Sequence, residues 1–215
     1  MIGLLQWFVF GLVRLLAGAQ AHWVGCAPVR RQRIYFANHG SHLDTVVIAA
    51  ALPPELRAET HPVAALDYWG KSAVRTFIAV RCLNAVLINR SGHAADTDPL
   101  QPLAKPLEDG HSLILFPEGT RGDGQVGAFK SGLYHLACRF PDAELIPVYL
   151  ENLHRVLPKG SMLLVPLLCT LWFGSPIKVA DGEAKADFLN RARLALVGLA
   201  EGRGVRGQSE SDKES

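Results

Sequence analysis

Residues 33–52 read Arg-Ile-Tyr-Phe-Ala-Asn-His-Gly-Ser-His-Leu-Asp-Thr-Val-Val-Ile-Ala-Ala-Ala-Leu, and this stretch decides the fold. The apolar run Ile34–Ala37 predicts a buried strand, and Leu43–Leu52 predicts a helix. A turn of small and polar residues joins the two. Because α/β proteins place their sites at the carboxyl ends of strands, this turn is the first candidate for chemistry.

The same alternation of short apolar runs and helical patterns continues along the chain. It predicts further strands at Pro62–Leu66, Ala85–Asn89, Ser112–Phe116, Leu145–Leu150 and Leu168–Phe173, and further helices at Lys71–Val80, Pro99–Glu108, Lys130–Phe140 and Glu183–Leu199. Alternation of this kind indicates an α/β layered fold in which much of the sheet is parallel.

Composition narrows the class of protein. The 215 residues suffice for one domain, and 49% of them are hydrophobic while 20% are charged. A formal net charge of +2 is too small for a nucleic-acid binder, so we expect no nucleic acid as a partner. The four cysteines show neither zinc-ligand nor disulfide spacing, so we expect reduced thiols that fill the core, and no metal site.

The amino-terminal segment Ile2–Leu16 is strongly apolar and is interrupted only by Gln6 and Arg14. As a helix it is too short for the roughly 30 Å hydrocarbon core of a bilayer. We therefore predict a helix that lies in the membrane interface, with a cleaved signal peptide or an ordinary buried helix as alternatives. The predicted organisation is a membrane-contacting helix at 1–22, a folded domain at 23–201 and a disordered tail at 202–215.

The turn after the first strand contains a candidate base, His39, and a candidate partner, Asp44. On one continuous helix, five residues of separation would keep these side chains apart, so His39 is expected in the turn and Asp44 in the first helical turn, with Ser41 as N-cap. Asp44 could then fold back, fix the tautomer of His39 and leave its other nitrogen free to take a proton. His42 is a second candidate base. The alternative is that Asp44 is only a capping carboxylate and His39 an ordinary loop histidine.

A second polar cluster, Phe116-Pro-Glu-Gly-Thr-Arg121, follows another predicted strand and precedes three glycines. A glycine-rich loop allows an anionic substrate to approach the backbone closely, and Arg121 could hold a phosphate with two hydrogen bonds. Lys130 adds a cation at the start of the next helix and is a further candidate ligand of the substrate phosphate. A surface turn with a Glu–Arg pair is the alternative for this cluster.

Taken together, Asn-His-x4-Asp at residues 38–44 and Phe-Pro-Glu-Gly-Thr-Arg at 116–121 resemble the motifs of the glycerolipid acyltransferase family, especially the lysophosphatidic acid acyltransferases. Ile146-Pro-Val148 is similar to the fourth motif of that family, and Leu157-Pro-Lys-Gly160 is similar to the segment after that motif. Asn89-Arg90 ends a strand where the second motif places its arginine. The resemblance covers roughly residues 30–180.

The resemblance implies an α/β domain with a central mixed, largely parallel β-sheet flanked by helices, and an N-terminal membrane-associated helix. It implies that His39 is the base, that Asp44 is its partner, and that a phosphate-bearing acceptor is held by five residues: Arg90, Glu118, Gly119, Thr120 and Arg121. We expect a fatty acyl group to pass directly from acyl-CoA or an acyl carrier protein to the hydroxyl of lysophosphatidic acid. Neither a metal nor a cofactor is needed. Membrane lipids are the expected partners, and the cytoplasmic face of a membrane is the expected location.

The second motif departs from the pattern of the family, because Asn84 and Leu87 stand where glycine and phenylalanine are usual. This departure keeps other acceptors open: glycerol phosphate, another lysophospholipid or a lyso-aminolipid. A non-catalytic membrane module that binds lipid is the alternative of a different class.

Overall fold

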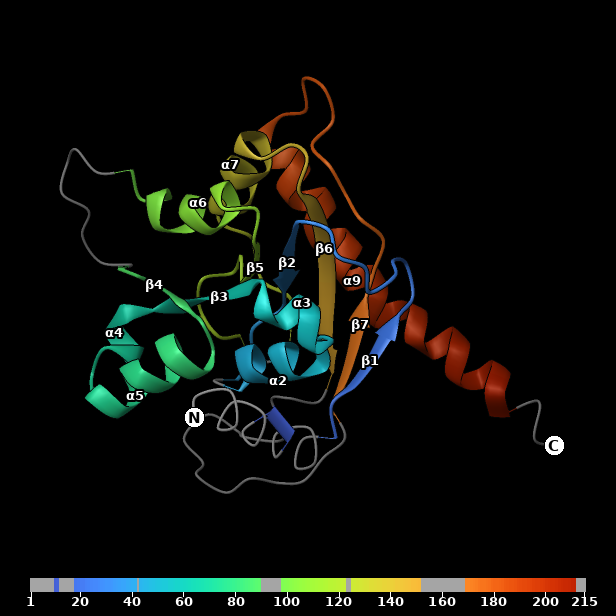
Figure 1. The fold of residues 1–215 in the computed structure, drawn as a ribbon. Coiled ribbons are helices and arrows are strands. Elements are labelled where there is room, and N and C mark those ends of the chain that lie inside the picture. The colour runs from blue at the N-terminus through green and yellow to red at the C-terminus, as the bar shows by residue number, and fades with distance from the viewer. Residues whose placement is uncertain are drawn as a thin grey trace.

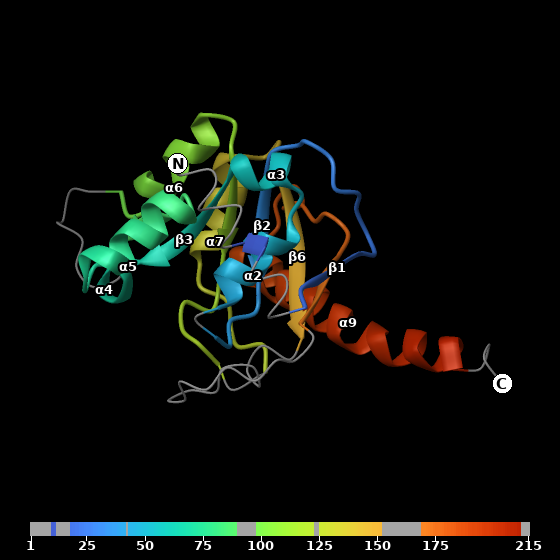
Figure 2. The ribbon, with the colours of Figure 1, turned by 60° about the horizontal axis from the view of Figure 1, so that its bottom comes forward.

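The computed structural model describes residues 10–11, 18–41, 43–89, 98–122, 125–151 and 169–211, with side chains described to Gly202. Figures 1 and 2 show a twisted sheet with helices on both faces and the end of the last helix pointing away from the sheet. This arrangement is the α/β architecture that the alternating sequence pattern predicts.

A seven-stranded sheet runs through the domain in the order β1-β7-β6-β2-β5-β3-β4. The strands are β1 (Gln20–Trp23), β2 (Arg33–Ala37), β3 (Thr60–Ala65), β4 (Val86–Ile88), β5 (Ser112–Leu115), β6 (Glu144–Glu151) and β7 (Thr170–Phe173). Neighbours pair in parallel except β6 and β7, which are antiparallel. The sheet is therefore mixed and mostly parallel, and β2, β3, β4 and β5 end at the same edge.

Short helices connect these strands. They are α2 (Asp44–Ala51), α3 (Pro54–Ala58), α4 (Leu66–Trp69), α5 (Ala73–Phe77), the π-helical turn η1 (Ile78–Cys82), α6 (Gln101–Glu108), α7 (Gly132–Arg139) and α9 (Lys185–Ser211). Pro54 lies at the first position of α3, where its fixed φ angle suits a helix start.

Alternate side chains of β2 bury two different cores. Tyr35 and Ala37 pack with residues of α2 and α3, whereas Ile34 and Phe36 pack with α6, α7 and α9 on the other face. All five residues of β2 are buried. A strand covered on both faces reads as a continuous apolar run, which is why the central strand was predictable from sequence.

Several predicted boundaries need correction. The proposed domain boundary after residue 22 falls inside β1, which pairs in parallel with β7. The predicted strand Pro62–Leu66 is displaced to Thr60–Ala65 because Leu66 begins α4. The predicted helix Lys71–Val80 starts at Ala73 and changes to a π-helical turn at Ile78.

The carboxyl-terminal residues also differ from the prediction. Backbone of α9 continues as helix to Ser211, where the sequence predicted a disordered tail after Glu201. Extending an existing helix needs no new nucleation, so a segment without apolar anchors can continue one. Within the described ranges, every helix falls short of the length or apolarity that crossing a bilayer requires. Most of the predicted interfacial helix Ile2–Leu16 lies outside the described residues.

The cysteines are free, as expected, but they do not all fill the core. Cys82 and Cys169 are buried, Cys26 is partly buried, and Cys138 is exposed on α7. Burial raises the pKa of Cys169 to about 11, and the negative charge of Asp44 adds to the increase. Cys169 is therefore a neutral thiol at physiological pH and a poor nucleophile.

Candidate active site

His39 and Asp44 are in direct contact at the carboxyl end of β2. The His39 Nδ1 and the Asp44 Oδ2 are 2.8 Å apart, and the same oxygen accepts from the backbone N–H groups of Gly40 at 2.7 Å and Ser41 at 2.9 Å. The carboxyl side chain is 1% exposed and the imidazole 19%. A carboxylate in this position receives the Nδ1–H and leaves Nε2 as the nitrogen that can accept a proton.

The cap of α2 differs from the prediction although the contact with His39 does not. Leu43, rather than Ser41, is the N-cap residue of the helix, and the Ser41 hydroxyl accepts from the Leu43 N–H at 3.2 Å. Among the described residues, Asp44 Oδ1 is buried without a hydrogen-bond partner. An unsatisfied buried oxygen costs free energy, and such costs are concentrated at functional sites.

The second predicted cluster holds the backbone of His39 on both sides. The His39 N–H donates to Glu118 Oε1 at 3.0 Å, and the Gly122 N–H donates to the His39 carbonyl at 2.8 Å. The imidazole also stacks on the ring of Phe116, with ring centres 4.3 Å apart. The two motifs, separated by about eighty residues in sequence, therefore form one rigid site.

Glu118 is buried and joins three segments of the site. Besides the His39 amide, its carboxylate accepts the N–H of Gly127 at 3.1 Å through Oε2. Burial raises the pKa of Glu118, while the two backbone donors act in the opposite direction. The sequence predicted a substrate ligand here, but the contacts of Glu118 are those of a residue that positions the loop.

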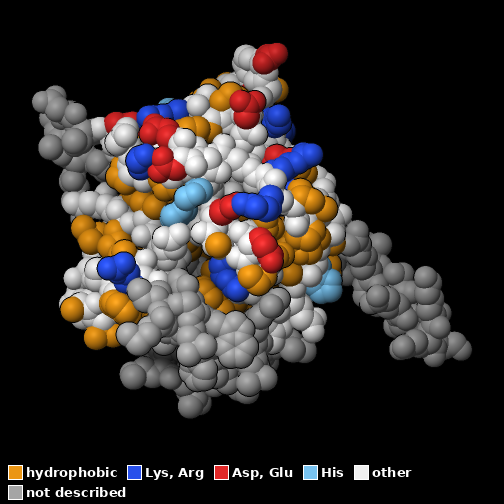
Figure 3. Space-filling model, in the orientation of Figure 1, with side chains coloured by type: hydrophobic (Ala, Val, Ile, Leu, Met, Phe, Trp, Pro, Cys, Tyr) orange, Lys and Arg blue, Asp and Glu red, His pale blue; other side chains and the backbone are white. Residues whose placement is uncertain are grey.

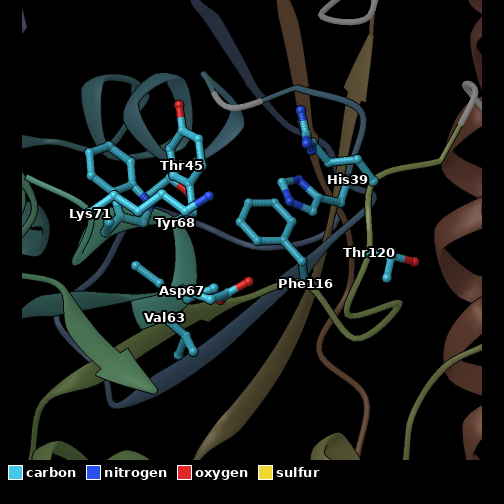
Figure 4. A pocket seen from close by; sticks show the side chains of 12 residues that line it. His39, Thr45, Val63, Asp67, Tyr68, Lys71, Phe116 and Thr120 are labelled. Carbon is cyan, nitrogen blue, oxygen red and sulfur yellow. The ribbon is translucent and has the colours of Figure 1, made fainter. Parts of the chain in front are cut away.

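A polar cavity of about 320 Å³ opens beside this pair. Its lining includes His39, Thr120 and Arg121, so residues of both sequence motifs line one cavity. Figure 4 shows His39 and Phe116 on one side of the cavity, with Lys71 and Tyr68 on the opposite side. Two cations, Arg121 and Lys71, thus line a space that also contains the candidate base.

A larger apolar cavity of about 570 Å³ adjoins the polar one. It shares His39, Phe116 and the end of β3 with the polar cavity, and is otherwise lined mainly by apolar residues: Ile88, Pro99, Leu100, Leu103, Leu115, Leu133 and Leu136. Lys130 lines this cavity rather than the polar one. The two predicted loop cations therefore face different spaces.

Gly119 allows Lys130 to cross the loop. Gly119 has a φ angle of +71°, and a Cβ atom added there would come within 2.7 Å of the Lys130 side chain. Lys130 is fixed in turn by its backbone N–H, which donates to the Pro117 carbonyl at 2.8 Å. The positive φ angle favours glycine at this position, whereas the neighbouring atoms belong to the flexible end of the Lys130 side chain.

The second motif retains a glycine-like backbone despite its substitution. Asn84 has a φ angle of +55°, the left-handed conformation that asparagine adopts more readily than other non-glycine residues. Its carbonyl accepts a hydrogen bond from His61 Nδ1 at 2.9 Å. The predicted phosphate ligand Arg90 and the second candidate base His42 lie outside the described residues.

The side of the polar cavity opposite His39 was not predicted from the sequence. Asp67, Tyr68 and Trp69 come from α4, and Lys71 follows it; all four line the polar cavity. These residues come directly after β3, which ends at the same sheet edge as β2. The rule that drew attention to His39, polar residues after a buried strand, would have found them.

Comparisons with known proteins identify the family of the chain. Residues 23–151 match the model of the family described as Acyltransferase. A 1-acyl-sn-glycerol-3-phosphate acyltransferase of Limnanthes alba is 29% identical over 174 residues, which cover 80% of this chain and 59% of the relative. An enzyme of the same name from Cocos nucifera is 29% identical over 196 residues, 83% of this chain and 60% of the relative.

A solved structure shares the fold. PlsC, the 1-acyl-sn-glycerophosphate acyltransferase of Thermotoga maritima, superposes with a TM-score of 0.69 at 20% sequence identity, covering 92% of this chain and 81% of that one. The chain spans about three fifths of the length of the two plant relatives. The family match covers more than half of the chain and includes the His39, Asp44 and Glu118 to Arg121 segments. The chain therefore belongs to the acyltransferase family.

Proposed function

We propose that this protein transfers a fatty acyl group from an acyl thioester to the free hydroxyl of lysophosphatidic acid. The observation that carries the proposal is the position of His39, braced by Asp44, in the lining of both a cation-lined cavity and an apolar one. The names of the plant relatives and of PlsC support the choice of acceptor.

His39 is the general base of the proposed reaction. Its Nε2 removes the proton of the acceptor hydroxyl as the oxygen attacks the thioester carbonyl, and Asp44 stabilises the imidazolium that forms. The tetrahedral intermediate then collapses, the carbon–sulfur bond breaks, and His39 returns the proton to the leaving thiolate. An ester and a free thiol result, so the step needs no oxidant, reductant, metal or cofactor.

The two cavities bind different substrates, the acceptor in the polar cavity and the acyl donor in the apolar one. Arg121, with Arg90 from the second motif, binds the phosphate of the acceptor, because a guanidinium can donate two parallel hydrogen bonds to a phosphate. Lys71 adds a further positive charge to that cavity. The apolar cavity takes the acyl chain of the donor, acyl-CoA or an acyl carrier protein, and Lys130 lies at its polar side.

The substrates place the protein at a membrane. Lysophosphatidic acid is a membrane lipid, and the segment Ile2–Leu16 is suited to the interface of the cytoplasmic leaflet, where acyl thioesters are available. Membrane lipids are thus both substrate and partner.

Product identification tests the proposal. The purified full chain is incubated with a pool of lysophosphatidic acid, glycerol phosphate, lysophosphatidylcholine and a lyso-aminolipid, together with acyl-CoA or acylated carrier protein, and the products are identified by mass spectrometry. We expect phosphatidic acid as the main new ester. A different ester would identify another lipid as the acceptor, and free fatty acid alone would mean thioester hydrolysis. Vesicle binding without any new product would mean a non-catalytic lipid-binding module.

A further inference from the structure

We propose that the exposed surface of α4, α5 and η1 docks onto an anionic membrane, independently of the amino-terminal segment. This membrane-docking surface consists of the apolar residues Leu66, Val74, Phe77, Ile78 and Val80 and the basic residues Arg75 and Arg81. Docking itself needs no assumption about the reaction. Its use, the delivery of a lysolipid to the polar cavity, rests on the proposed function.

Apolar exposure is concentrated in this one segment. Of the seven large hydrophobic residues exposed in the described part of the chain, five lie between Leu66 and Val80. Val74 is 68% exposed and Phe77 47%. Figure 3 shows the resulting cluster of hydrophobic side chains, with a basic side chain beside it, over α4 and α5. Contiguous apolar patches on a protein surface mark sites of interaction with membranes or partners.

Three of the five apolar residues share a helix face. Val74, Phe77 and Ile78 stand at positions i, i+3 and i+4, the spacing that aligns side chains along one side of a helix. A short helix that presents such a face lies well in the boundary between headgroups and acyl chains. Tyr68 and Trp69, which precede it in α4, are partly buried and line the polar cavity, so they are not counted in this surface.

Charge selects an anionic bilayer as the occupant. Between Leu66 and Leu83 there are three basic residues, Lys71, Arg75 and Arg81, and one acid, Asp67. All four are exposed, so the surface is positive around its apolar centre. The Arg75 guanidinium lies 4.8 Å from the centre of the Tyr68 ring, which leaves it near the apolar residues. Basic residues near a membrane surface each add attraction to anionic lipids.

The same segment forms a wall of the candidate site. Asp67, Tyr68 and Lys71 line the polar cavity, while Leu66 and Val74 face outward. A bilayer seated on this surface would lie beside the cavity that contains His39. An acceptor lipid would then need to leave the membrane only partly in order to place its phosphate and hydroxyl at the site.

Depth-dependent fluorescence quenching tests the docking without measuring turnover. In a Cys138→Ser background, a polarity-sensitive dye is attached to Val74→Cys or, as the matched control on α9, to Leu194→Cys; Leu194 is also exposed, at 54%. The full chain is mixed with vesicles of phosphatidylcholine and phosphatidylglycerol that carry nitroxide on the acyl chains. We expect a blue shift and strong quenching of the dye at position 74 and neither at position 194.

Every other outcome overturns the proposal. A dye at position 74 that stays in water while the protein is bound would show that another surface contacts the membrane. Quenching at both positions would show insertion without a defined surface, and absence of binding would remove the membrane as occupant. A blue shift that depends on protein concentration without vesicles would identify a second copy of the chain as the occupant.

Substitutions give a second measurement. We expect the double variant Val74→Ser, Phe77→Ser to partition onto these vesicles about tenfold less than the unmodified chain. Each substitution removes an apolar side chain whose burial in the membrane would contribute free energy. The matched pair Val29→Ser with Leu194→Ser should change partitioning less than about twofold, because isolated exposed apolar residues are ordinary. Arg75→Gln should weaken binding to vesicles with phosphatidylglycerol and leave binding to pure phosphatidylcholine unchanged. Equal losses in both pairs would contradict the proposal.

An activity comparison separates this proposal from the proposed function. The Val74→Ser, Phe77→Ser variant should acylate a short-chain, monomeric lysophosphatidic acid at the normal rate and a vesicle-bound one slowly. If the unmodified chain acylates neither, the proposed reaction fails while the quenching result stands. If the variant acylates both normally, the docking proposal fails while the reaction stands.

Discussion

The polar and apolar cavities share His39, Phe116 and the end of β3 but differ in the rest of their lining. The polar cavity of about 320 Å³ is lined by Arg121, Lys71 and Thr120, whereas the apolar cavity of about 570 Å³ is lined chiefly by leucines and other aliphatic residues. Their shared wall is also where the two sequence motifs are hydrogen-bonded to each other. The difference indicates a site that receives a charged group from one side and a hydrocarbon chain from the other.

The largest loss of activity is expected from a substitution at the His39–Asp44 pair, where the two cavities meet. Asp44→Asn removes the charge that stabilises the His39 imidazolium and disturbs its tautomer, so the rate of acyl transfer should fall by about 10²–10⁴. Steady-state kinetics with both substrates measures the loss. The exposed Asp142→Asn serves as the matched control and should retain its activity. A rate for Asp44→Asn within about threefold of normal would mean that the carboxylate only caps the turn.

The second-largest loss of activity is expected from a substitution in the polar cavity. Arg121→Ala should raise the KM for the phosphate-bearing acceptor about 10–100-fold, because the substrate phosphate loses a charge-assisted hydrogen bond. The KM for the acyl donor should stay nearly unchanged. Lys130→Ala, on the other cavity, should affect the acceptor much less. Equal effects of the two substitutions on acceptor KM would show that the cavities do not divide the substrates as proposed.

The wall also needs Glu118 for its stability. Glu118→Ala leaves the buried amides of His39 and Gly127 without their acceptor, so the free energy of unfolding should fall by about 1–3 kcal/mol. Denaturant unfolding followed by circular dichroism measures it, with the exposed Glu55→Ala as control. Were Glu118→Ala to lower acceptor affinity without loss of stability, Glu118 would be the substrate ligand that the sequence first predicted.

The effect in the apolar cavity is expected to be confined to the longest acyl donors. Gly132 lines it, and a Cβ added there meets only Leu100 at 3.8 Å, so Gly132→Leu should fit and occupy part of the space. The preferred acyl donor should become shorter, with a change in relative kcat/KM of about 10–100-fold for the longest chain and little change for the shortest. Competition among acyl-CoA donors of different lengths measures this. An unaltered chain-length profile would place the acyl chain elsewhere.

Much of the fold was predictable because its central strands are buried on both faces. β2, β5 and β6 form apolar runs that need no tertiary information to recognise, and the turn after β2 places His39 and Asp44 by local spacing alone. The edge strand β1 gave no such signal. Its residues alternate between exposed and partly buried, and it becomes a strand because β7 offers a pairing edge.

Site features that depend on distant segments could not be predicted in the same way. The role of Glu118 follows from backbone donors at His39 and Gly127, which the fold brings together and the sequence does not. Arg121 and Lys130 line different cavities, which their proximity in the sequence does not indicate. The change to a π-helical turn at Ile78 also has no local sequence signature.

The most direct test of the proposed mechanism is the rate of acyl transfer by a His39→Gln protein whose melting temperature matches that of the unmodified chain. His22→Gln is the matched control, because His22 is exposed on β1 and stacks on Trp172. We predict a loss of about 10²–10⁴ for His39→Gln and an unchanged rate for His22→Gln. Full activity in a folded His39→Gln protein would contradict the role of His39 as the base.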